Sequence, residues 1–335
     1  MRILVFEFIT GGGLIDQALP QSLLQEAYLM RNALIDDLLE IPNIELLVLH
    51  DKRTTMHNGD LQWLTIDQGV VLARYLQEMQ SLYDAVWLIA PETDGILLQW
   101  CQFFSAQAKS LCTSSEVAVA LCQDKLQTIK CLSAAGVACV PTHAYIEPAQ
   151  EQGHWVLKNN NSVGCDEVYL LRSVHDWKAV LARLKASNVY IIQPYIKGKA
   201  MSLSCLFYQG EAYFICCNEQ HLQIEQQQFV LTACTVHVQA EQAKQYQQLC
   251  SSIAAAIPEL FAYVGIDFIQ TESGECLILE INPRLTSSYA GIKAALGINI
   301  ATQVLRLANN EQPILTKSTE QSIRININNG IIHAR

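Results

Sequence analysis

The sequence predicts an α/β protein with two or three domains. Its 335 residues exceed what one hydrophobic core usually organises. Short apolar runs alternate with helical periodicity over residues 1–112, which is typical of a small open α/β domain. Two further apolar runs between residues 264 and 282 flank a turn signal and predict an antiparallel hairpin.

The composition excludes several classes of protein. Hydrophobic residues make up 50% of the chain and charged residues 16%, which is typical of a globular rather than a disordered protein. The net charge of -10 argues against a nucleic-acid groove, which needs a basic surface. No apolar run approaches the length that spans a bilayer. We therefore expect neither nucleic acid nor a membrane as a partner.

The twelve cysteines are scattered, and none forms a Cys-x-x-Cys pair. Most lie in apolar surroundings, so we expect reduced core thiols and a cytoplasmic location. A zinc site is an alternative that no ligand spacing supports. Met1 to Phe8 has one positive charge and a short apolar run, which predicts a first strand rather than a signal peptide.

The first domain begins with a strand and a glycine-rich loop. Further along, helical periodicity and apolar runs predict a helix over 21–40 and strands over 45–50 and 85–90. The loop glycines Gly11, Gly12 and Gly13 lack the G-x-G-x-x-G spacing, because Asp16 stands where the third glycine belongs. We expect a tight turn near a substrate pocket rather than a dinucleotide loop.

The middle of the chain predicts a strand-loop-strand unit that could bind phosphate. A helix over 114–135, with Ser115 as its cap, contains Lys125, and a helical lysine is usually solvated. A strand then ends at Lys158, a polar loop follows at 159–165, and a strand resumes at 168–171. Backbone N–H groups of such a loop can bind phosphate oxygens, and Lys158 would add a point charge. An ordinary hairpin with an Asn-rich turn is the alternative.

The second half of the chain reads mainly as strands, without an internal repeat. We expect residues 220–228 to form a loop or a strand edge. The other predicted elements are strands over 188–195, 200–208, 212–217, 229–238 and 323–327, and helices over 240–256 and 291–309.

The hairpin carries the most informative residues. If its turn is centred between Ser273 and Gly274, Asp267 lies opposite Glu280, and Asn282 shares their face. Adjacent carboxylates repel unless a cation lies between them, and two carboxylates with an amide suit Mg²⁺ held against a nucleotide. A solvated face with incidental acids is the alternative, but the second strand is too apolar to be fully exposed.

Taken in this order, residues 113–330 resemble the ATP-grasp superfamily, and the first domain resembles the pre-ATP-grasp domain that usually precedes it. The resemblance implies an N-terminal open α/β domain followed by a two-part ATP-grasp fold with a lid. We place the pre-ATP-grasp domain at 1–112, the part with the lid at 113–195, and the part with the metal and phosphate site at 196–335.

The resemblance also implies two cofactors, ATP and Mg²⁺, with Mn²⁺ as the alternative cation. It further implies a role for each motif. The expected site comprises phosphate-binding Lys125 and Lys158, the lid residues Ser162 and Gly164, the adenine hinge Gln193, Pro194, Tyr195 and Ile196, the metal ligands Asp267, Glu280 and Asn282, and Arg284 beside the transferred phosphoryl group; Arg284 and Lys158 are the expected catalytic residues.

Three positions depart from the superfamily's pattern. Ala200 stands where an acidic residue commonly holds the ribose hydroxyls, so ribose contacts must come from elsewhere or be weaker. Gln193 replaces a glutamate, although its amide oxygen can still accept from the adenine amino group. The lid loop is poor in glycine, which leaves Ser162 and Gly164 most of the phosphate contact.

Within the superfamily, the segments 6–13 and 282–292 resemble the tyramine–glutamate ligases of methanofuran biosynthesis. This resemblance implies joining of the γ-carboxyl group of glutamate to tyramine or a similar aromatic amine through an acyl phosphate. Ser287, Ser288, Tyr289 and the Gly11–Gly13 loop are the candidates for the amine slot. Similar ligases are commonly dimers, so a homodimer is a possible assembly.

Two other functions remain open from the residues. The chain could be an ATP-grasp ligase for another pair of substrates, or a relative that senses nucleotide without turnover, which Ala200 and the thin lid loop favour. ADP release that depends on candidate substrates distinguishes an enzyme from a sensor.

Overall fold

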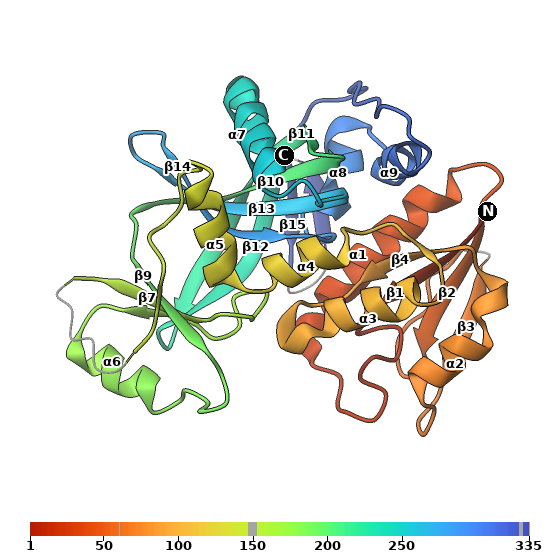
Figure 1. Ribbon diagram of the computed structural model, residues 1–335, viewed down its shortest axis with the longest axis horizontal. Helices are drawn as coiled ribbons and strands as arrows, with labels where there is room; N and C mark the ends of the chain where they lie inside the picture. The colour runs from red at the N-terminus through yellow and green to blue at the C-terminus, as the bar shows by residue number, and fades with distance from the viewer. Residues whose placement is uncertain (60, 147–152, 328–330, 335) are drawn as a thin grey trace.

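A parallel sheet forms the first domain, at one end of the molecule (Figure 1). The computed structural model describes residues 1–59, 61–146, 153–327 and 331–334. The described strands run in the order β3 (Gln62–Ile66), β2 (Glu45–Asp51), β1 (Arg2–Glu7), β4 (Ala85–Ile89) and β5 (Ser110–Leu111). Strand order reverses between β1 and β4, and ligands of open α/β sheets bind at the carboxyl ends of strands at such a point. The fold therefore directs attention to the loops that follow β1 and β4.

Helices cover both faces of this sheet, and α1 (Gln21–Leu39) also contacts the rest of the protein. Its residues Leu34, Ile35 and Leu38 are buried in one core together with α8 (Tyr289–Leu296) and α9 (Ile300–Ala308). The remaining helical segments of the domain are α2 (Leu72–Glu78), η1 (Gln80–Leu82), η2 (Thr93–Gly95) and α3 (Ile96–Ser105). Helix α1 therefore lies between the two sheets, and it lines the site described below.

A larger sheet, antiparallel at every named strand pairing in the described residues, organises the rest of the chain. Its path is β14 (Cys276–Asn282), β13 (Ala262–Thr271), β10 (Gly198–Tyr208), β11 (Glu211–Glu225), β12 (Gln228–Val238), β8 (Val168–Leu171), β7 (Trp155–Asn159), β9 (Tyr190–Pro194) and β6 (His143–Ala144), with β15 (Ile323–Asn326) on β12 and β16 (Ile331–Ala334) on β15. Helix α7 (Ala243–Ala256), after η3 (Ala240–Gln242), packs on β11.

The expected lid is a separate lobe. Figure 1 shows β7, β9 and α6 (Val174–Leu181) projecting from the larger sheet, across from the first domain. The lobe has its own small core, which includes Leu157, Val180 and Ile192. The parallel sheet ends at Leu111 and the long strands begin at Gly198, which supports the division that we propose near residues 112 and 195.

The helix predicted over 114–135 is two helices, α4 (Glu116–Cys122) and α5 (Lys125–Ala134). Ser115 caps α4 as expected, because its side chain accepts from the Ala118 amide at 3.2 Å. The expectation of one continuous helix was wrong at Asp124, whose carboxylate accepts from the Gln127 amide at 2.9 Å and starts a second helix. Lys125 therefore begins α5, and its side chain is buried rather than solvated.

The helix predicted over 291–309 is also divided. Gly297 ends α8 with a φ of +69°, and the Asn299 side chain accepts from the Thr302 amide at 2.9 Å to start α9. Of the two expectations for residues 220–228, a loop or a strand edge, the structure gives the strand edge: β11 continues to Glu225, paired there with β12 and no longer with β10, before a turn at Gln226 and Gln227. This extension carries Gln220 toward the hairpin.

The predicted pairing of Asp267 with Glu280 is confirmed, although the turn lies elsewhere. Gly274, with a φ of +83°, donates to the Thr271 carbonyl at 3.0 Å, and Gln270 pairs with Cys276, so the loop is centred on Ser273. That centre alone would bring Leu279 opposite Asp267. A bulge between Asp267 and Phe268 leaves Leu279 unpaired and restores the expected register.

Two expectations about the chain's surroundings can be compared with the fold. All twelve cysteines have free thiols. Within the described ranges, no helix combines the length and the apolar character that crossing a membrane would require.

Candidate active site

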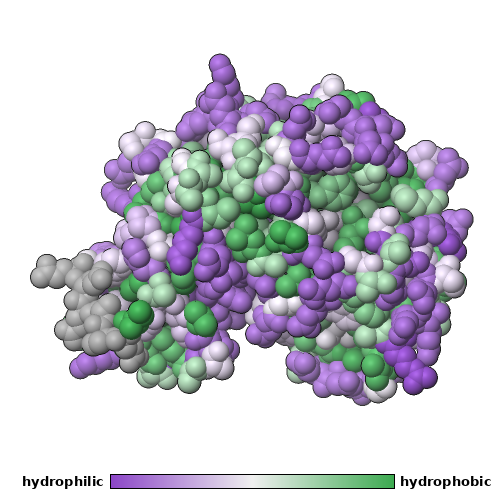
Figure 2. All heavy atoms as spheres, viewed as in Figure 1, coloured by the Kyte–Doolittle hydropathy of each residue, from purple (hydrophilic) through white to green (hydrophobic). Residues whose placement is uncertain are grey.

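A cavity of about 630 Å³ lies where the lid lobe, the larger sheet and the first domain meet. The face of the molecule drawn in Figure 2 is notched between the lid lobe and the first domain. The cavity walls include Lys158 of β7, Asp267 of β13 and Glu26 of α1, so each part of the fold contributes. This convergence makes it the candidate active site.

The acid pair stands on one wall of this cavity. The Asn282 amide nitrogen donates to Asp267 Oδ2 at 3.1 Å, and Gln220 Nε2 donates to Asp267 Oδ1 at 3.0 Å. Burial, and then the charge of Glu280, raise the pKa of Asp267 to about 8. Without a cation the two acids therefore share a proton at neutral pH. Sequence reasoning missed Gln220, because reading residues 220–228 as a loop or a strand edge gives no sign of a partner 47 positions away.

Two buried lysines lie beside Glu280. Lys125 Nζ is 3.4 Å from Glu280 Oε2 and also donates to the Ser162 carbonyl. Burial lowers the pKa of Lys158 to about 8, because desolvation disfavours its charged form. Burial also opposes ionisation of Glu280, but Lys125 and Lys158 together hold its pKa below the ordinary value. The structure thus brings both predicted lysines to the predicted acid pair.

The donor set fits a cation that is shared with phosphate. Asp267, Glu280 and Asn282 supply hard oxygen atoms on one face, and burial, followed by the charge of Glu280, raises the pKa of Asp267. No group of three or more His, Cys, Asp or Glu suited to a metal is found in the described part of the chain. A complete protein cage is therefore not formed, which suits Mg²⁺, since it commonly binds one or two carboxylates and completes its shell with water and phosphate.

The lid loop reaches the same cavity with backbone in unusual conformations. Gly164 and Cys165 have φ values of +62° and +66°, and both line the cavity with Ser162. The base of the loop is held by buried Glu167, which accepts from Asn159 at 2.7 Å and pairs with Lys185 at 3.0 Å. The thin loop predicted from the sequence is thus anchored by a residue that the sequence did not single out.

The expected adenine hinge lines the cavity along β9. Gln193, Pro194, Tyr195 and Ile196 all contribute to its wall. Gln193 Nε2 donates to the Thr142 hydroxyl at 2.7 Å, which fixes the amide and leaves its oxygen as an acceptor. Ala200 lines the same wall without a polar side chain.

Arg284 lines the cavity and is held by the first domain. Its Nε and Nη2 lie 3.0 and 2.9 Å from Glu92 Oε2, in the loop that follows β4. Glu92 is buried, and its other oxygen has no hydrogen-bond partner among the described residues. This contact between residues 192 positions apart has no local sequence signal.

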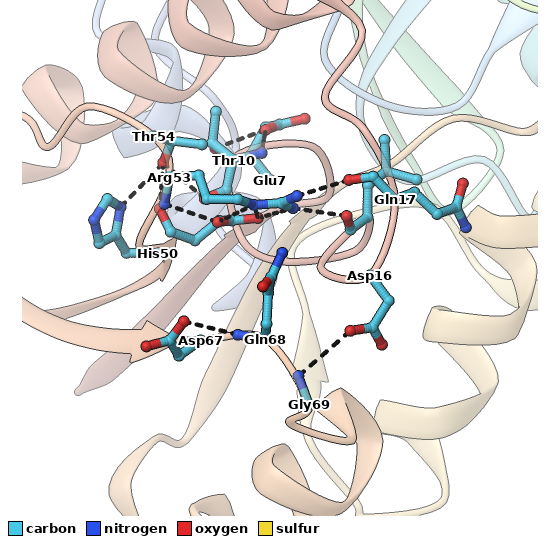
Figure 3. Close-up of polar contacts among 12 residues, drawn as sticks. Glu7, Thr10, Asp16, Gln17, His50, Arg53, Thr54, Asp67, Gln68 and Gly69 are labelled. Carbon is cyan, nitrogen blue, oxygen red and sulfur yellow. Dashed lines mark hydrogen bonds and ion pairs between the residues drawn. The ribbon is translucent and has the colours of Figure 1, made fainter.

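The glycine loop lies differently from the expectation. Among the described residues that line the cavity, Glu7 and Ile9 are present but Gly11, Gly12 and Gly13 are not. A Cβ on Gly13 would lie 2.3 Å from the Phe8 ring, so this glycine permits close packing. Figure 3 shows Arg53 donating to the Gln17 carbonyl, at 2.7 Å. Arg53 also donates to the Leu14 carbonyl at 2.7 Å, so its side chain holds the loop at two points.

The segment after β14 was also predicted to contact substrate. Ser287 and Ser288 line the cavity, and the Ser287 hydroxyl donates to the Glu26 carboxylate. Tyr289 does not belong to the described cavity wall: it is buried between the domains, and its hydroxyl donates to Asp37 Oδ2 at 2.7 Å. Its position supports a role in the domain contact rather than in the amine slot.

Comparisons with known proteins agree with this architecture. Residues 44–119 match the pre ATP-grasp 3 domain family, and residues 122–288 match an ATP-grasp domain family. A tyramine–L-glutamate ligase of Methanocaldococcus fervens is 25% identical over 315 residues, which cover 92% of this chain and 95% of that protein.

Solved structures share the fold at lower identity. A protein assigned to the ATP-grasp superfamily from Archaeoglobus fulgidus has a TM-score of 0.71 and 19% identity, covering 97% of this chain and 92% of its own. The biotin carboxylase domain of Hydrogenobacter thermophilus 2-oxoglutarate carboxylase, a dimer in complex with MgADP, ADP and bicarbonate, has a TM-score of 0.70 and 15% identity, covering 96% and 73%. An L-amino acid ligase from Bacillus licheniformis has a TM-score of 0.66 and 11% identity, covering 96% and 78%.

Proposed function

We propose, from the premise that the chain belongs to the ATP-grasp superfamily and is an ATP-dependent C–N ligase, that it joins the γ-carboxyl group of L-glutamate to tyramine or a similar aromatic amine. The observation that carries the proposal is the meeting of Asp267 and Glu280 with Lys125 and Lys158 inside one cavity. The glutamate and tyramine assignment draws its support from the relative that matches 92% of the chain.

ATP would occupy the part of the cavity between the lid and the larger sheet. The hinge from Gln193 to Ile196 would receive the adenine, and Lys125 and Lys158 would hold the α- and β-phosphates with the backbone of Ser162 and Gly164. Asp267, Glu280 and Asn282 would hold Mg²⁺, or Mn²⁺ in its place. When bound, the cation would neutralise charge on the β- and γ-phosphates.

The proposed reaction has two steps, activation of the carboxylate and formation of the amide. The glutamate carboxylate forms a bond to the γ-phosphorus and ADP leaves, which gives an acyl phosphate. The ammonium group of the amine first releases a proton to solvent, and the neutral nitrogen then bonds to the acyl carbon. Inorganic phosphate leaves, and the nitrogen releases a second proton. Arg284 would steady the transferring phosphoryl group, and the closed lid would exclude water from the hydrolysable acyl phosphate.

The cellular setting follows from the chemistry of the chain. The twelve free thiols support a cytoplasmic location, where reducing conditions keep thiols reduced. The substrates are small molecules, and a homodimer remains a proposal that sedimentation would test.

The test is an ADP-release screen of glutamate against aromatic amines, with mass detection of the product. We expect a γ-glutamyl amide, with ADP and phosphate formed in equal amounts and only when both substrates are present. Glu280→Gln is the inactive control. A preference for aliphatic amines or amino acids would reject the substrate assignment. Release of AMP with every substrate pair would reject acyl phosphate formation itself.

A further inference from the structure

We propose that Glu26 recognises the ammonium group of the amine substrate, and that this wall of the cavity selects against amines that have a carboxylate beside the ammonium. The inference rests on the proposed function, because it assumes that an amine enters this cavity. It adds a specificity-determining residue, which lies on α1 and outside the sheet that holds the acid pair and the lysines.

Helix α1 presents one face to the cavity. Leu23, Glu26, Ala27 and Met30 line the wall, at the spacing that places residues on one side of a helix. Three of the four are apolar, so the carboxylate of Glu26 is the charged group on an otherwise apolar face. A molecule that combines a cationic group with an apolar body fits such a face.

The loops that follow β1 and β4 extend this apolar wall. Ile9 and Ile89 line the cavity from the carboxyl edge of the parallel sheet. Both come from the point where the strand order reverses, which is where ligands bind in open α/β sheets. The body of an aromatic amine can therefore lie against the first domain while its ammonium contacts Glu26.

Glu26 is fixed in place but has no ion-pair partner. The buried Ser287 hydroxyl donates to its Oε1, which holds the carboxylate at the wall. No salt bridge to Glu26 occurs among the described residues, whereas the nearby Glu92 is paired with Arg284. Glu26 also lies within electrostatic range of Arg284 and of the lid residue Cys165. Its charge is thus available where the three parts of the site meet.

The neighbouring acids are less suited to this role. The Glu7 carboxylate accepts from the amide and the hydroxyl of Thr10 at 2.7 Å each, and from the Ile9 amide at 3.1 Å. Those contacts commit Glu7 to its own loop. Glu92 is bound to Arg284 and does not belong to the described cavity wall.

The cations of the cavity explain the selection against a carboxylate. The lysines and arginines that line the cavity, among the described residues, are Lys125, Lys158, Lys199 and Arg284. Lys125 lies at Glu280, Lys199 adjoins Ala200 near the hinge, and Arg284 is engaged by Glu92 through two nitrogen atoms. Lys158 faces Glu280 and Asp267. An α-amino acid bound through Glu26 would therefore bring its carboxylate toward the like charge of Glu26, whereas Lys125, Lys158 and Arg284 already face other carboxylates.

Calorimetric titration of the intact protein tests this proposal. Tyramine and tyrosine are compared in the presence of glutamate, Mg²⁺ and a non-hydrolysable ATP analogue. We expect tyramine to bind at least tenfold more tightly than tyrosine. Glu26→Gln keeps the acceptor for Ser287 but removes the charge, so it should weaken tyramine binding about 10- to 100-fold and narrow the preference. Glu26→Lys should invert the preference.

A matched control removes a charge from the same helix. Asp36 is exposed and pairs with His57 at 3.0 Å, so Asp36→Asn should leave tyramine affinity unchanged. Equal tyramine affinity in wild type and Glu26→Gln would overturn the proposal, as would equal affinity of the wild type for tyramine and tyrosine or the absence of tyramine binding. Melting temperature and affinity for the ATP analogue show that each variant is folded.

Turnover separates this proposal from the proposed function. If tyramine binds in a way that depends on Glu26 but no ADP is released, the ligase assignment falls and the role of Glu26 stands. If wild type and Glu26→Gln form the tyramine amide with the same KM, the role of Glu26 falls and the ligase assignment stands.

Discussion

Asp267→Asn is expected to abolish turnover and, at the same time, to stabilise the ligand-free protein. The loss of activity follows from removing one of the two carboxylates that would hold the cation. The gain in stability follows because burial and Glu280 raise the pKa of Asp267 to about 8. The neutral amide has nearly the same shape and does not carry that electrostatic cost.

The size of the gain depends on pH in a defined direction. The ordinary pKa of an aspartate is near 3.8, so between about pH 4 and pH 8 the unfolded chain has lost a proton that folded Asp267 retains. The free energy of unfolding of the wild type therefore falls as pH rises through this window. From the unfolded pKa up to pH 7 is about three pKa units, so ionisation at this site lowers the wild type's free energy of unfolding by roughly 4 kcal/mol at pH 7.

The substitution also loses something. Gln220 and Asn282 each donate to a different oxygen of Asp267, and an amide has one oxygen, so about 1 kcal/mol is forfeited. The net gain at pH 7 is then roughly 3 kcal/mol, or about 4 °C in melting temperature for a chain of this length. At pH 5 the electrostatic contribution to the gain falls to about one pKa unit, which the lost hydrogen bond nearly offsets, so the stability gain nearly vanishes.

Thermal unfolding without nucleotide and with a chelator, at pH 5 and pH 7.5, measures this effect. Mg²⁺ and the ATP analogue at 100 times Kd should remove most of the difference, because the wild type gains about 2.7 kcal/mol and the variant does not. Glu275→Gln removes an exposed acid from the same hairpin and should change stability by less than about 0.5 kcal/mol. A lower melting temperature for Asp267→Asn at pH 7.5, or ADP release near the wild-type rate, would refute the reasoning.

Three further predictions follow from the same site. Lys158→Ala should weaken binding of a non-hydrolysable ATP analogue more than binding of glutamate; unchanged calorimetric affinity for the analogue would remove Lys158 from the phosphate site. Glu92→Gln should lower kcat about tenfold or more with a smaller change in KM, because Arg284 loses its charged partner, and steady-state kinetics showing a change in KM alone would contradict this. Gly13→Ala should destabilise the protein by about 1–3 kcal/mol, since a Cβ there would overlap the Phe8 ring, and an unshifted urea midpoint would contradict that packing role.

The acid pair could be predicted because strand periodicity and turn position are local properties of a hairpin. Asp267 and Glu280 are 13 positions apart, and alternation alone places Asn282 on their face. The prediction placed the turn centre too far along the chain and missed the bulge at Leu279. These two errors in the register cancelled, so the predicted pair was nevertheless correct. Alternation along a strand does not reveal a bulge, because a bulge changes the phase of only one strand.

The divided helices show a different kind of failure. Asp124 and Asn299 are good N-cap residues, and Gly297 is a typical helix end, so the sequence held the signals that the hydrophobic periodicity masked. The missed division of the helix affected the interpretation of Lys125. On one continuous helix Lys125 taken alone is a solvated residue, and only the family resemblance made it a phosphate ligand, whereas the second cap puts it at the start of α5 beside Glu280.

The partners that complete the site could not be predicted, because each comes from a distant part of the chain. Gln220 lies 47 positions from Asp267, Glu92 lies 192 from Arg284, and the Glu26 contact spans 261 residues. No periodicity relates residues at such separations. Only the folded arrangement of the first domain against the larger sheet brings them together.

Those long-range contacts share one short segment, and this limits how the site can respond to change. Arg284, Ser287 and Tyr289 contact Glu92, Glu26 and Asp37 of the first domain in turn. The six residues from 284 to 289 follow directly after the strand that holds Glu280 and Asn282. A shift of α1 or of the loop after β4 would therefore alter the Arg284 position and the amine wall together, while the acid pair stays fixed by the pairing of β13 with β14. On the proposed function, the activating chemistry would belong to the larger sheet and the choice of amine to the first domain, and substitutions on the cavity face of α1 should change substrate preference without disturbing the acid pair.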